Sequence, residues 1–215
     1  MNIISKYKST ILLFVLSSLW ALHFSLVKLV EADNNPFSIL VPLLLILCFL
    51  FFIVLKINNQ AFKFTLRKSL FFIIAGIFAY VIPLYVEFLV APKIDAGILV
   101  LIVSSVPVFT LLIVWLFRLL SINLKLILGT LSGIVGVSLI MFGNSNNTLN
   151  IWAILALIVP LSYSFDAIFM EKFWPSKLNT FQVAFGECIA SLILIIFLNF
   201  LLGTSIGEYT YWLKL

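Results

Sequence analysis

Charged residues are scarce in this sequence. Only 10% of the 215 residues are charged, against roughly 25% in an ordinary soluble domain. A soluble domain of this size leaves much of its surface in water, so it could not hide a chain that is 64% hydrophobic. The mean hydropathy of +1.26 and the 22 phenylalanines agree with this. We therefore expect lipid to be the solvent for most of these side chains.

The shortage of histidine and cysteine excludes several kinds of site. His23 is the only histidine, and the two cysteines, Cys48 and Cys188, lie inside apolar runs. These residues are too few for a metal cluster or a disulfide framework, so we expect no metal and no cofactor, and we interpret the cysteines as core residues. The sequence also has no Gly-x-Ser-x-Gly elbow, which argues against an intramembrane enzyme.

Seven long apolar segments are each suited to a membrane-spanning helix. A span needs about 20 apolar residues, because the hydrocarbon core is about 30 Å thick and a helix rises 1.5 Å per residue. The runs are continuous, unlike the alternating strands of a barrel, so we predict an all-α membrane protein with seven transmembrane helices. The predicted spans are Thr10–Val30, Phe37–Leu55, Ser69–Phe88, Ala96–Phe117, Leu124–Phe142, Ile151–Phe169 and Phe181–Leu202.

The basic residues of the connectors predict the orientation of the chain. If the N-terminus is cytoplasmic, only Lys28, Lys93 and Lys214 of the 13 lysines and arginines lie outside. The other ten would then lie inside, and an excess of lysine and arginine is typical of cytoplasmic loops. We therefore expect a multi-pass protein of a bacterial inner membrane with its N-terminus inside. This orientation argues against a seven-helix receptor, whose N-terminus lies outside. The seventh span has no lysine for a Schiff base, which argues against a retinal protein. The basic residues form no continuous patch, so the net charge of +5 does not indicate nucleic-acid binding.

The first and sixth spans resemble each other. Each places an aromatic residue after a serine and a lysine eight or nine residues later. Trp20 and Tyr163 are 143 positions apart, and so are Phe37 and Thr180, near the starts of the second and seventh spans. A five-helix unit repeated once gives two halves of opposite orientation, because five is odd. Inverted repeats of this kind are typical of secondary transporters.

The repeat predicts how the chain is divided. We expect a first five-helix repeat over residues 1–143 and an incomplete second repeat over residues 149–215, with two helices and the loop that follows them. Two complete units would be longer than this sequence. We therefore expect either a truncated protein or a fragment.

Three stretches, Leu19–Lys28, Ala96–Thr110 and Leu128–Leu139, carry motifs in a defined order along the chain. Together they resemble the drug/metabolite transporter superfamily, EamA type. The first is similar to that family's Trp-Gly-x-x-Phe-x-x-x-Lys first helix, the second to its Ala-Gly…Pro-Val-Phe fourth helix, and the third to its Gly-x-x-x-Gly-x-x-Gly-Val fifth helix. The resemblance covers essentially the whole chain, and it implies ten helices in two inverted repeats. The sequence departs from the family at Pro42, where many relatives carry an arginine, and at Glu187, where a cation is expected.

The resemblance and the spans together predict an integral membrane transporter of small metabolites, a secondary transporter that works as an exporter and not an enzyme. Its expected partners are a small-molecule substrate and the lipid bilayer, with a homodimer as an open alternative. The competing interpretation is a truncated, non-transporting remnant or a helical assembly partner in the membrane.

Ionisable side chains inside spans are costly in lipid and are therefore candidates for a substrate or ion pathway. Glu187 lies about 12 Å into the seventh span, and it is either a structural hydrogen-bond partner or a proton or substrate-amine site facing a central cavity. Asp166 belongs to the pathway, or else it reaches the headgroups or pairs with Lys172. Lys28 and Glu87 lie near the outer ends of their spans and could pair as an outer gate, although Lys28 could instead extend to the interface.

Two residues of the first span and three of the fifth are further candidates. His23 is expected to donate to a backbone carbonyl, with a proton relay as the alternative. Trp20 lies nearer the middle of the membrane and could line the cavity. Gly129, Gly133 and Gly136 share one helix face, which would let a neighbouring helix approach closely, either for ordinary packing or for sliding.

Three prolines inside spans predict kinks. Pro83, Pro107 and Pro160 each remove an N–H donor and free a carbonyl one turn back. In lipid that carbonyl needs a helical neighbour or a water-lined cavity. We expect the kink before Pro107 to present Ser104 and Ser105 to the cavity, with a static kink as the alternative.

Overall fold

A computed structural model describes residues 3–29, 35–60, 62, 65–119, 124–142 and 151–203. Every regular element in this part of the chain is helical. The elements are α1 (Ile3–Leu29), α2 (Phe37–Ile57), α3 (Leu66–Gly76), the π-helical turn η1 (Ile77–Val81), α4 (Ile82–Val90), the 3-10 turn η2 (Ala91–Lys93), α5 (Ala96–Val103), α6 (Val106–Leu116), α7 (Leu124–Phe142), α8 (Ile151–Ala156), α9 (Ile158–Phe173) and α10 (Thr180–Leu201).

Within the described ranges, six helical segments are long and apolar enough to cross a membrane. They confirm an all-α, multi-pass membrane protein. The remaining predicted span, the fifth (Leu124–Phe142), corresponds to α7, whose apolar stretch Leu124–Gly136 is shorter than the other six. The six segments are Thr10–Val27, Phe37–Ile57, Lys68–Lys93, Ala96–Leu116, Ile151–Phe173 and Thr180–Leu201.

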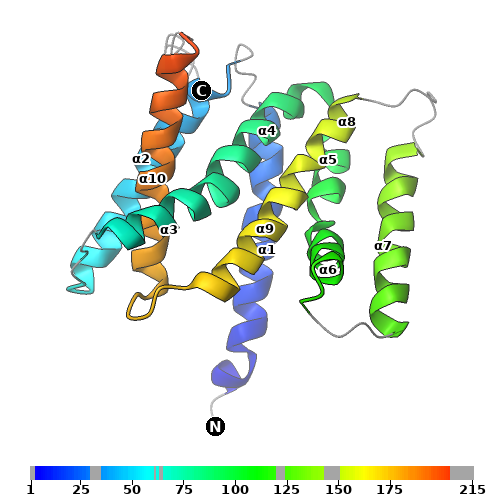
Figure 1. Cartoon of the computed structure of the whole chain (residues 1–215), viewed down its shortest axis with the longest axis horizontal. Helices are drawn as coiled ribbons and strands as arrows, with labels where there is room; N and C mark the ends of the chain where they lie inside the picture. Colours follow the sequence, from blue (N-terminus) through cyan, green and yellow to red (C-terminus); the bar gives the residue numbers. More distant parts are fainter. Residues whose placement is uncertain are drawn as a thin grey trace.

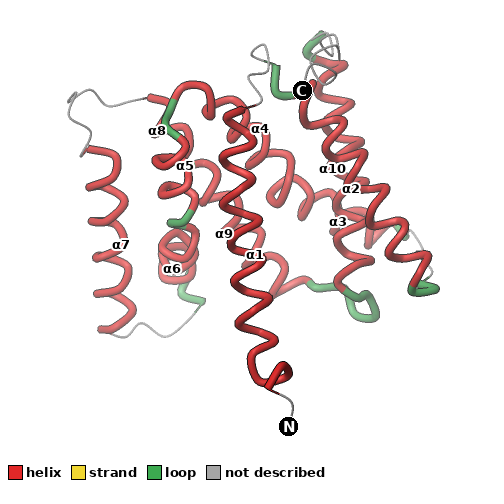
Figure 2. The backbone as a smooth tube through the Cα atoms, turned by 180° about the vertical axis from the view of Figure 1, so that it is seen from behind, coloured by secondary structure: helices red, strands yellow, loops and turns green. Residues whose placement is uncertain are grey.

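The spans run alternately up and down, with α2 and α10 at one edge of the molecule and α7 at the other (Figure 1). The view from behind shows the same order (Figure 2). Both α3–α4 and α8–α9 cross the molecule obliquely, and α9 packs against both α4 and α6. Because the helices cross obliquely, α9 contacts elements on two sides, and it is placed to form a wall of any site inside the bundle.

The three predicted kinks are confirmed as interruptions of the helices. Pro83 follows the π-helical turn η1, so the span Lys68–Lys93 is bent in its middle. Pro107 follows a break at Ser104 and Ser105 that separates α5 from α6. Pro160 follows the break at Leu157 that separates α8 from α9. The missing proline N–H explains the position of each break, since it removes one bond of the helical ladder.

Apolar side chains lie both inside and outside the helix bundle. The main core joins α2, α4, α5, α8, α9 and α10, and Leu40, Ile102, Val159 and Ile195 in it are fully buried. Phenylalanines such as Phe200, which is 81% exposed, cover the outside. Exposed apolar surface of this extent would be unstable in water and is normal against lipid tails.

Some predictions fall outside the described residues. These are the boundary between the two predicted repeats at residues 143–149, the loop after residue 203 and the side chain of Lys28. The predicted pairing of Lys28 with Glu87 therefore stays a prediction, and so does the division into repeats.

Candidate functional site

A pocket of about 620 Å³ lies among α1, α5, α6 and α9. The predicted residues Trp20, Ser104, Pro107 and Asp166 all line it. Its volume lies within the range of about 300–1,000 Å³ that is usual for small-molecule sites. The remaining lining residues are Ser17, Ala21, Phe24, Val100, Val103, Val106 and Tyr163.

One face of α1 forms a wall of the pocket. Its lining residues Ser17, Trp20, Ala21 and Phe24 follow the spacing i, i+3, i+4, i+7, which places them on one side of a helix. This spacing, counted from Trp20, was the signal that could have identified Ser17 and Phe24 from the sequence. The opposite wall is the break between α5 and α6, where the chain turns before Pro107 and leaves Ser104 exposed to the pocket.

Asp166 is the carboxylate of this pocket. Its Oδ1 atom is buried and has no hydrogen-bond partner in the described part of the chain. Asp166 makes no ion pair with Lys172 in the described part of the chain, so the expected pair between them is wrong. Pocket geometry explains the difference, because the carboxylate of Asp166 borders a cavity and not the helix end.

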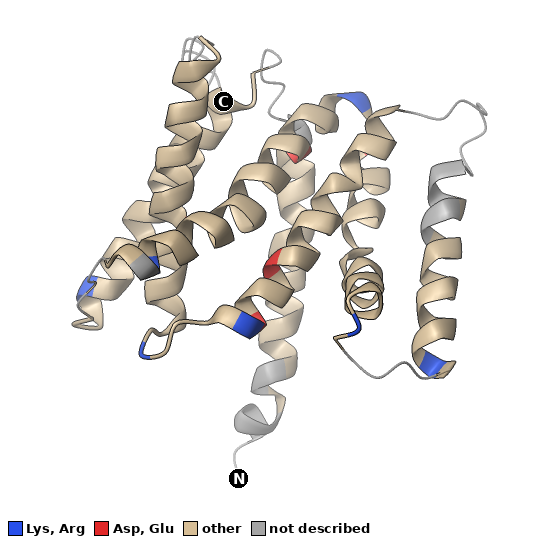
Figure 3. Cartoon of the chain, viewed as in Figure 1, with Lys and Arg blue, Asp and Glu red and all other residues tan. Residues whose placement is uncertain are grey.

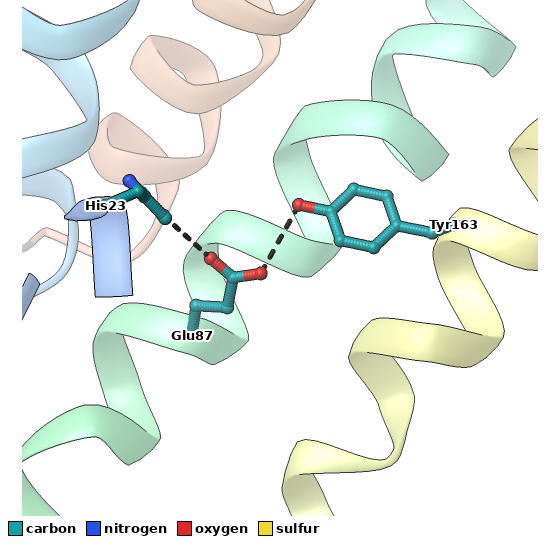
Figure 4. Close-up of polar contacts among 3 residues, drawn as sticks. All are labelled: His23, Glu87 and Tyr163. Atoms are coloured by element: carbon teal, nitrogen blue, oxygen red, sulfur yellow. Dashed lines mark hydrogen bonds and ion pairs between the residues drawn. The ribbon is translucent and has the colours of Figure 1, made fainter. Parts of the chain in front are cut away.

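A second carboxylate, that of Glu87, joins three helices. Glu87 on α4 is 1% exposed. His23 Nε2 on α1 lies 3.2 Å from its Oε2, and the Tyr163 hydroxyl on α9 donates to its Oε1 over 3.3 Å (Figure 4). The prediction that His23 donates to a backbone carbonyl is wrong, because the kinked α4 brings a carboxylate within its reach.

The two carboxylates lie at opposite ends of the contact between Trp20 and Tyr163, and of the two only Asp166 lines the pocket. His23 follows Trp20 by three residues on α1, and Asp166 follows Tyr163 by three residues on α9. Helices α1 and α9 run in opposite directions (Figure 1). One turn after Trp20, α1 therefore reaches His23, which contacts Glu87. One turn after Tyr163, α9 reaches Asp166, on the side away from Glu87. The rings of Trp20 and Tyr163 meet between the two ends.

Glu187 occupies a different place. It is 5% exposed on α10, its Oε1 atom has no hydrogen-bond partner among the described residues, and it is not part of the lining of the pocket. Helix α10 packs against α2, α3 and η1. Ser191 Oγ donates to Glu187 O at 2.7 Å and lies 3.1 Å from Gly76 O, beside the π-helical turn. Turns of this type are frequent at functional sites.

Of the remaining predicted residues, Ser105 and Gly133 are packed against neighbouring atoms. Ser105 is buried and donates to Ile102 O. A Cβ added at Gly133 would overlap with the side chain of Val108 on α6, whereas a Cβ at Gly129 or Gly136 would meet nothing within 4 Å. The close approach expected for the glycine face therefore occurs at Gly133 alone among these three.

Two side chains with structural roles were not predicted as site residues. Tyr163 both lines the pocket and holds Glu87, although the offset of 143 positions had already paired it with Trp20. Ser162 Oγ donates to Phe78 O in the π-helical turn at 2.8 Å. Nothing in the sequence around Ser162 points to this bond, because its partner lies 84 positions away.

The pocket offers one carboxylate, several hydroxyls and aromatic rings to a small molecule. The described residues contain no group of three or more metal-ligating side chains. The chain matches no curated protein and no solved structure. Residues 8–142, more than half of the 215, match the model of the EamA-like transporter family. With its multi-pass helical fold and its pocket between helices, the chain belongs to the EamA-like transporter family.

Proposed function

We propose that the protein is a secondary transporter of a small metabolite and that the substrate binds in the pocket among α1, α5, α6 and α9. The pocket itself is the observation that carries the proposal. Three of its walls come from the first predicted repeat and α9 comes from the second. Secondary transporters place their substrate sites between repeats, at helices that are interrupted. The break between α5 and α6 is such an interruption.

The polar cluster of His23, Glu87 and Tyr163 lies beside the pocket, where it can act as a gate. Glu87 joins α1, α4 and α9 through His23 and Tyr163, and Tyr163 also touches the pocket. Alternating access requires one end of a site to close while the other opens. In our proposal, this cluster closes one end, and a movement of α1 away from α4 and α9 would open it.

We propose that the N-terminus lies in the cytoplasm of a bacterial cell and that the direction of transport is export. Basic side chains gather at the lower end of the molecule (Figure 3). Lys56 ends α2, Lys172 ends α9 and Arg118 follows α6, whereas Lys93 lies at the opposite end in η2. Excess lysine and arginine favour the cytoplasmic side. The resemblance to drug/metabolite exporters favours the direction.

The test is transport by the purified 215-residue chain in proteoliposomes. Radiolabelled amines, amino acids and organic acids are offered with and without a proton gradient. Ala21→Trp fills the pocket and should abolish the uptake of any transported compound. Ala167→Trp is the matched control, because Ala167 is exposed on α9 and is not part of the pocket lining. Equal loss in both variants would contradict a substrate site in this pocket.

The same experiment examines the competing function. A non-transporting remnant or an assembly partner would move none of the compounds in either orientation of the vesicles. If no compound crosses although the chain is folded and inserted, the transporter proposal fails for this chain.

A further inference from the structure

We propose that the pocket is specific for protonated amines with an apolar body, and that Asp166 binds their ammonium group. This inference deepens the proposed function, because it names the substrate class of the same pocket. It rests on three properties of the lining: the hydrogen bonds that its hydroxyls already make, its charge, and its aromatic rings.

Each hydroxyl of the lining already donates a hydrogen bond within the protein. Ser17 Oγ donates to Leu13 O at 2.8 Å, and Ser104 Oγ donates to Val100 O at 2.7 Å. The Tyr163 hydroxyl donates a hydrogen bond to Glu87 Oε1. A hydroxyl carries one donor and two acceptor lone pairs. Towards a ligand, these three groups therefore act as acceptors, and they favour a ligand that is rich in N–H donors.

The charge of the lining has one sign. Asp166 is its only ionisable carboxylate, and the described lining contains no lysine, arginine or histidine. Oδ1 of Asp166 is buried without a hydrogen-bond partner in the described part of the chain, so the carboxylate lacks a donor there that would stabilise its negative charge. A cation against the part of this side chain that lines the pocket would compensate that charge. A carboxylate or phosphate on the ligand would meet acceptors and a like charge, and its burial would be costly.

Aromatic rings supply the rest of the surface. Trp20, Phe24 and Tyr163 all line the pocket. The faces of such rings attract cations and also cover apolar groups. A primary ammonium group has three donors, which matches one carboxylate and two hydroxyl oxygens. The volume of about 620 Å³ leaves room for an aromatic or aliphatic body behind the ammonium group.

The probe is phenethylamine, with three compounds that share its phenyl ring. These are the neutral 2-phenylethanol, the anionic 3-phenylpropanoate and the zwitterionic phenylalanine. Binding of radiolabelled phenethylamine to the full chain in nanodiscs is measured at neutral pH, and the three compounds are tested as competitors. We expect each of them to compete at least tenfold more weakly than unlabelled phenethylamine, because a charge-assisted hydrogen bond contributes about that much.

Variants assign the binding to the carboxylate. Asp166→Asn should weaken phenethylamine binding by about tenfold to a hundredfold, and Asp166→Glu should retain most of it. Glu171→Gln is the matched control, since it removes an exposed carboxylate from the same helix and should leave binding unchanged. Equal affinity for phenethylamine and 3-phenylpropanoate in the unmodified chain would overturn the inference, whatever the variants do.

The experiment separates this inference from the proposed function. Binding that depends on Asp166, without transport in proteoliposomes, would support the inference and contradict the transporter proposal. Transport of an anion that Ala21→Trp blocks, without phenethylamine binding, would do the reverse.

Discussion

The rings of Trp20 and Tyr163 meet edge to face, with centroids 6.2 Å apart and planes inclined at 84°. These are the residues that the offset of 143 positions pairs as equivalents. Two residues that a two-fold axis exchanges can touch only if the axis passes close to both. If the repeat is real, its axis therefore runs between these rings and through the pocket that they line.

The first prediction concerns this axis. In an experimental structure, α1 and α2 should superpose on α8–α9 and α10 after a rotation of about 180° about an axis in the membrane plane. The axis should pass between the rings of Trp20 and Tyr163. A best superposition with a rotation far from two-fold, or with an axis outside the pocket, would contradict the inverted repeat.

Features that depend on one local residue type could be predicted from the sequence. The spans follow from apolar length, and the breaks before Pro83, Pro107 and Pro160 follow from the missing proline N–H. The width of the turn η1 could not be predicted, because a proline does not specify whether the turn before it widens to a π-helix. That choice depends on bonds such as the one from Ser162 to Phe78 O.

Partners that lie far apart in sequence were predicted poorly. Glu87 lies towards one end of the span Lys68–Lys93, as expected, whereas the expectation that this end is the outer one stays a prediction. Its partners His23 and Tyr163 are 64 and 76 positions away in the sequence. A position along a helix can be counted from the sequence, whereas the direction of a side chain depends on how the helices cross. For the same reason, the separation of Glu187 from the pocket could not be predicted.

The second prediction concerns topology. Single cysteines are placed at Asn146 and Ser176 in a chain that lacks Cys48 and Cys188. Because the basic residues favour a cytoplasmic N-terminus, a membrane-impermeant thiol reagent applied to intact cells should label the first cysteine and spare the second. The reverse labelling pattern would refute the orientation. Labelling after cell lysis is the control that both positions react.

The third prediction concerns Gly133. Gly133→Ala should lower the free energy of unfolding by about 1–3 kcal/mol, because the added Cβ would overlap with Val108 on α6. Gly129→Ala is the matched variant. It meets open space, so it should be neutral or should stabilise the helix by up to about 1 kcal/mol. Thermal unfolding in detergent measures both.

A rescue makes this prediction sharper. Val108→Ala removes the atoms that would overlap and should restore most of the stability of the Gly133→Ala chain. If the two glycine variants are equally stable, α7 does not approach α6 as the structure describes.

The fourth prediction concerns the bond from Tyr163 to Glu87. Tyr163→Phe leaves Oε1 of a carboxylate that is 1% exposed without this partner, so it should cost about 1–3 kcal/mol of stability. Tyr85→Phe is the control. It removes a hydroxyl from the same helix as Glu87, and that hydroxyl makes no hydrogen bond to Glu87 in the described part of the chain. Equal melting temperatures for the two variants would show that the bond contributes little.

Glu187 is a buried carboxylate that does not line the pocket. Its Oε1 atom is buried without a hydrogen-bond partner among the described residues. The ionisable side chains near it come from three elements: Tyr80 in η1, Asp166 on α9 and Cys188 on α10. An ionised carboxylate without a partner in this environment would cost several kcal/mol. We therefore expect Glu187 to take up a proton or a cation in this conformation.

The last prediction is that Glu187 exchanges a proton during transport. Glu187→Gln keeps the shape and the hydrogen-bonding capacity of the side chain but removes the titration. Transport by proteoliposomes should then become independent of pH near neutrality, and a proton gradient should no longer drive it. Glu171→Gln, exposed on α9, should leave both properties unchanged. If Glu187→Gln transports at an unchanged rate with an unchanged pH dependence, Glu187 has a structural role only and is not the group that exchanges the proton.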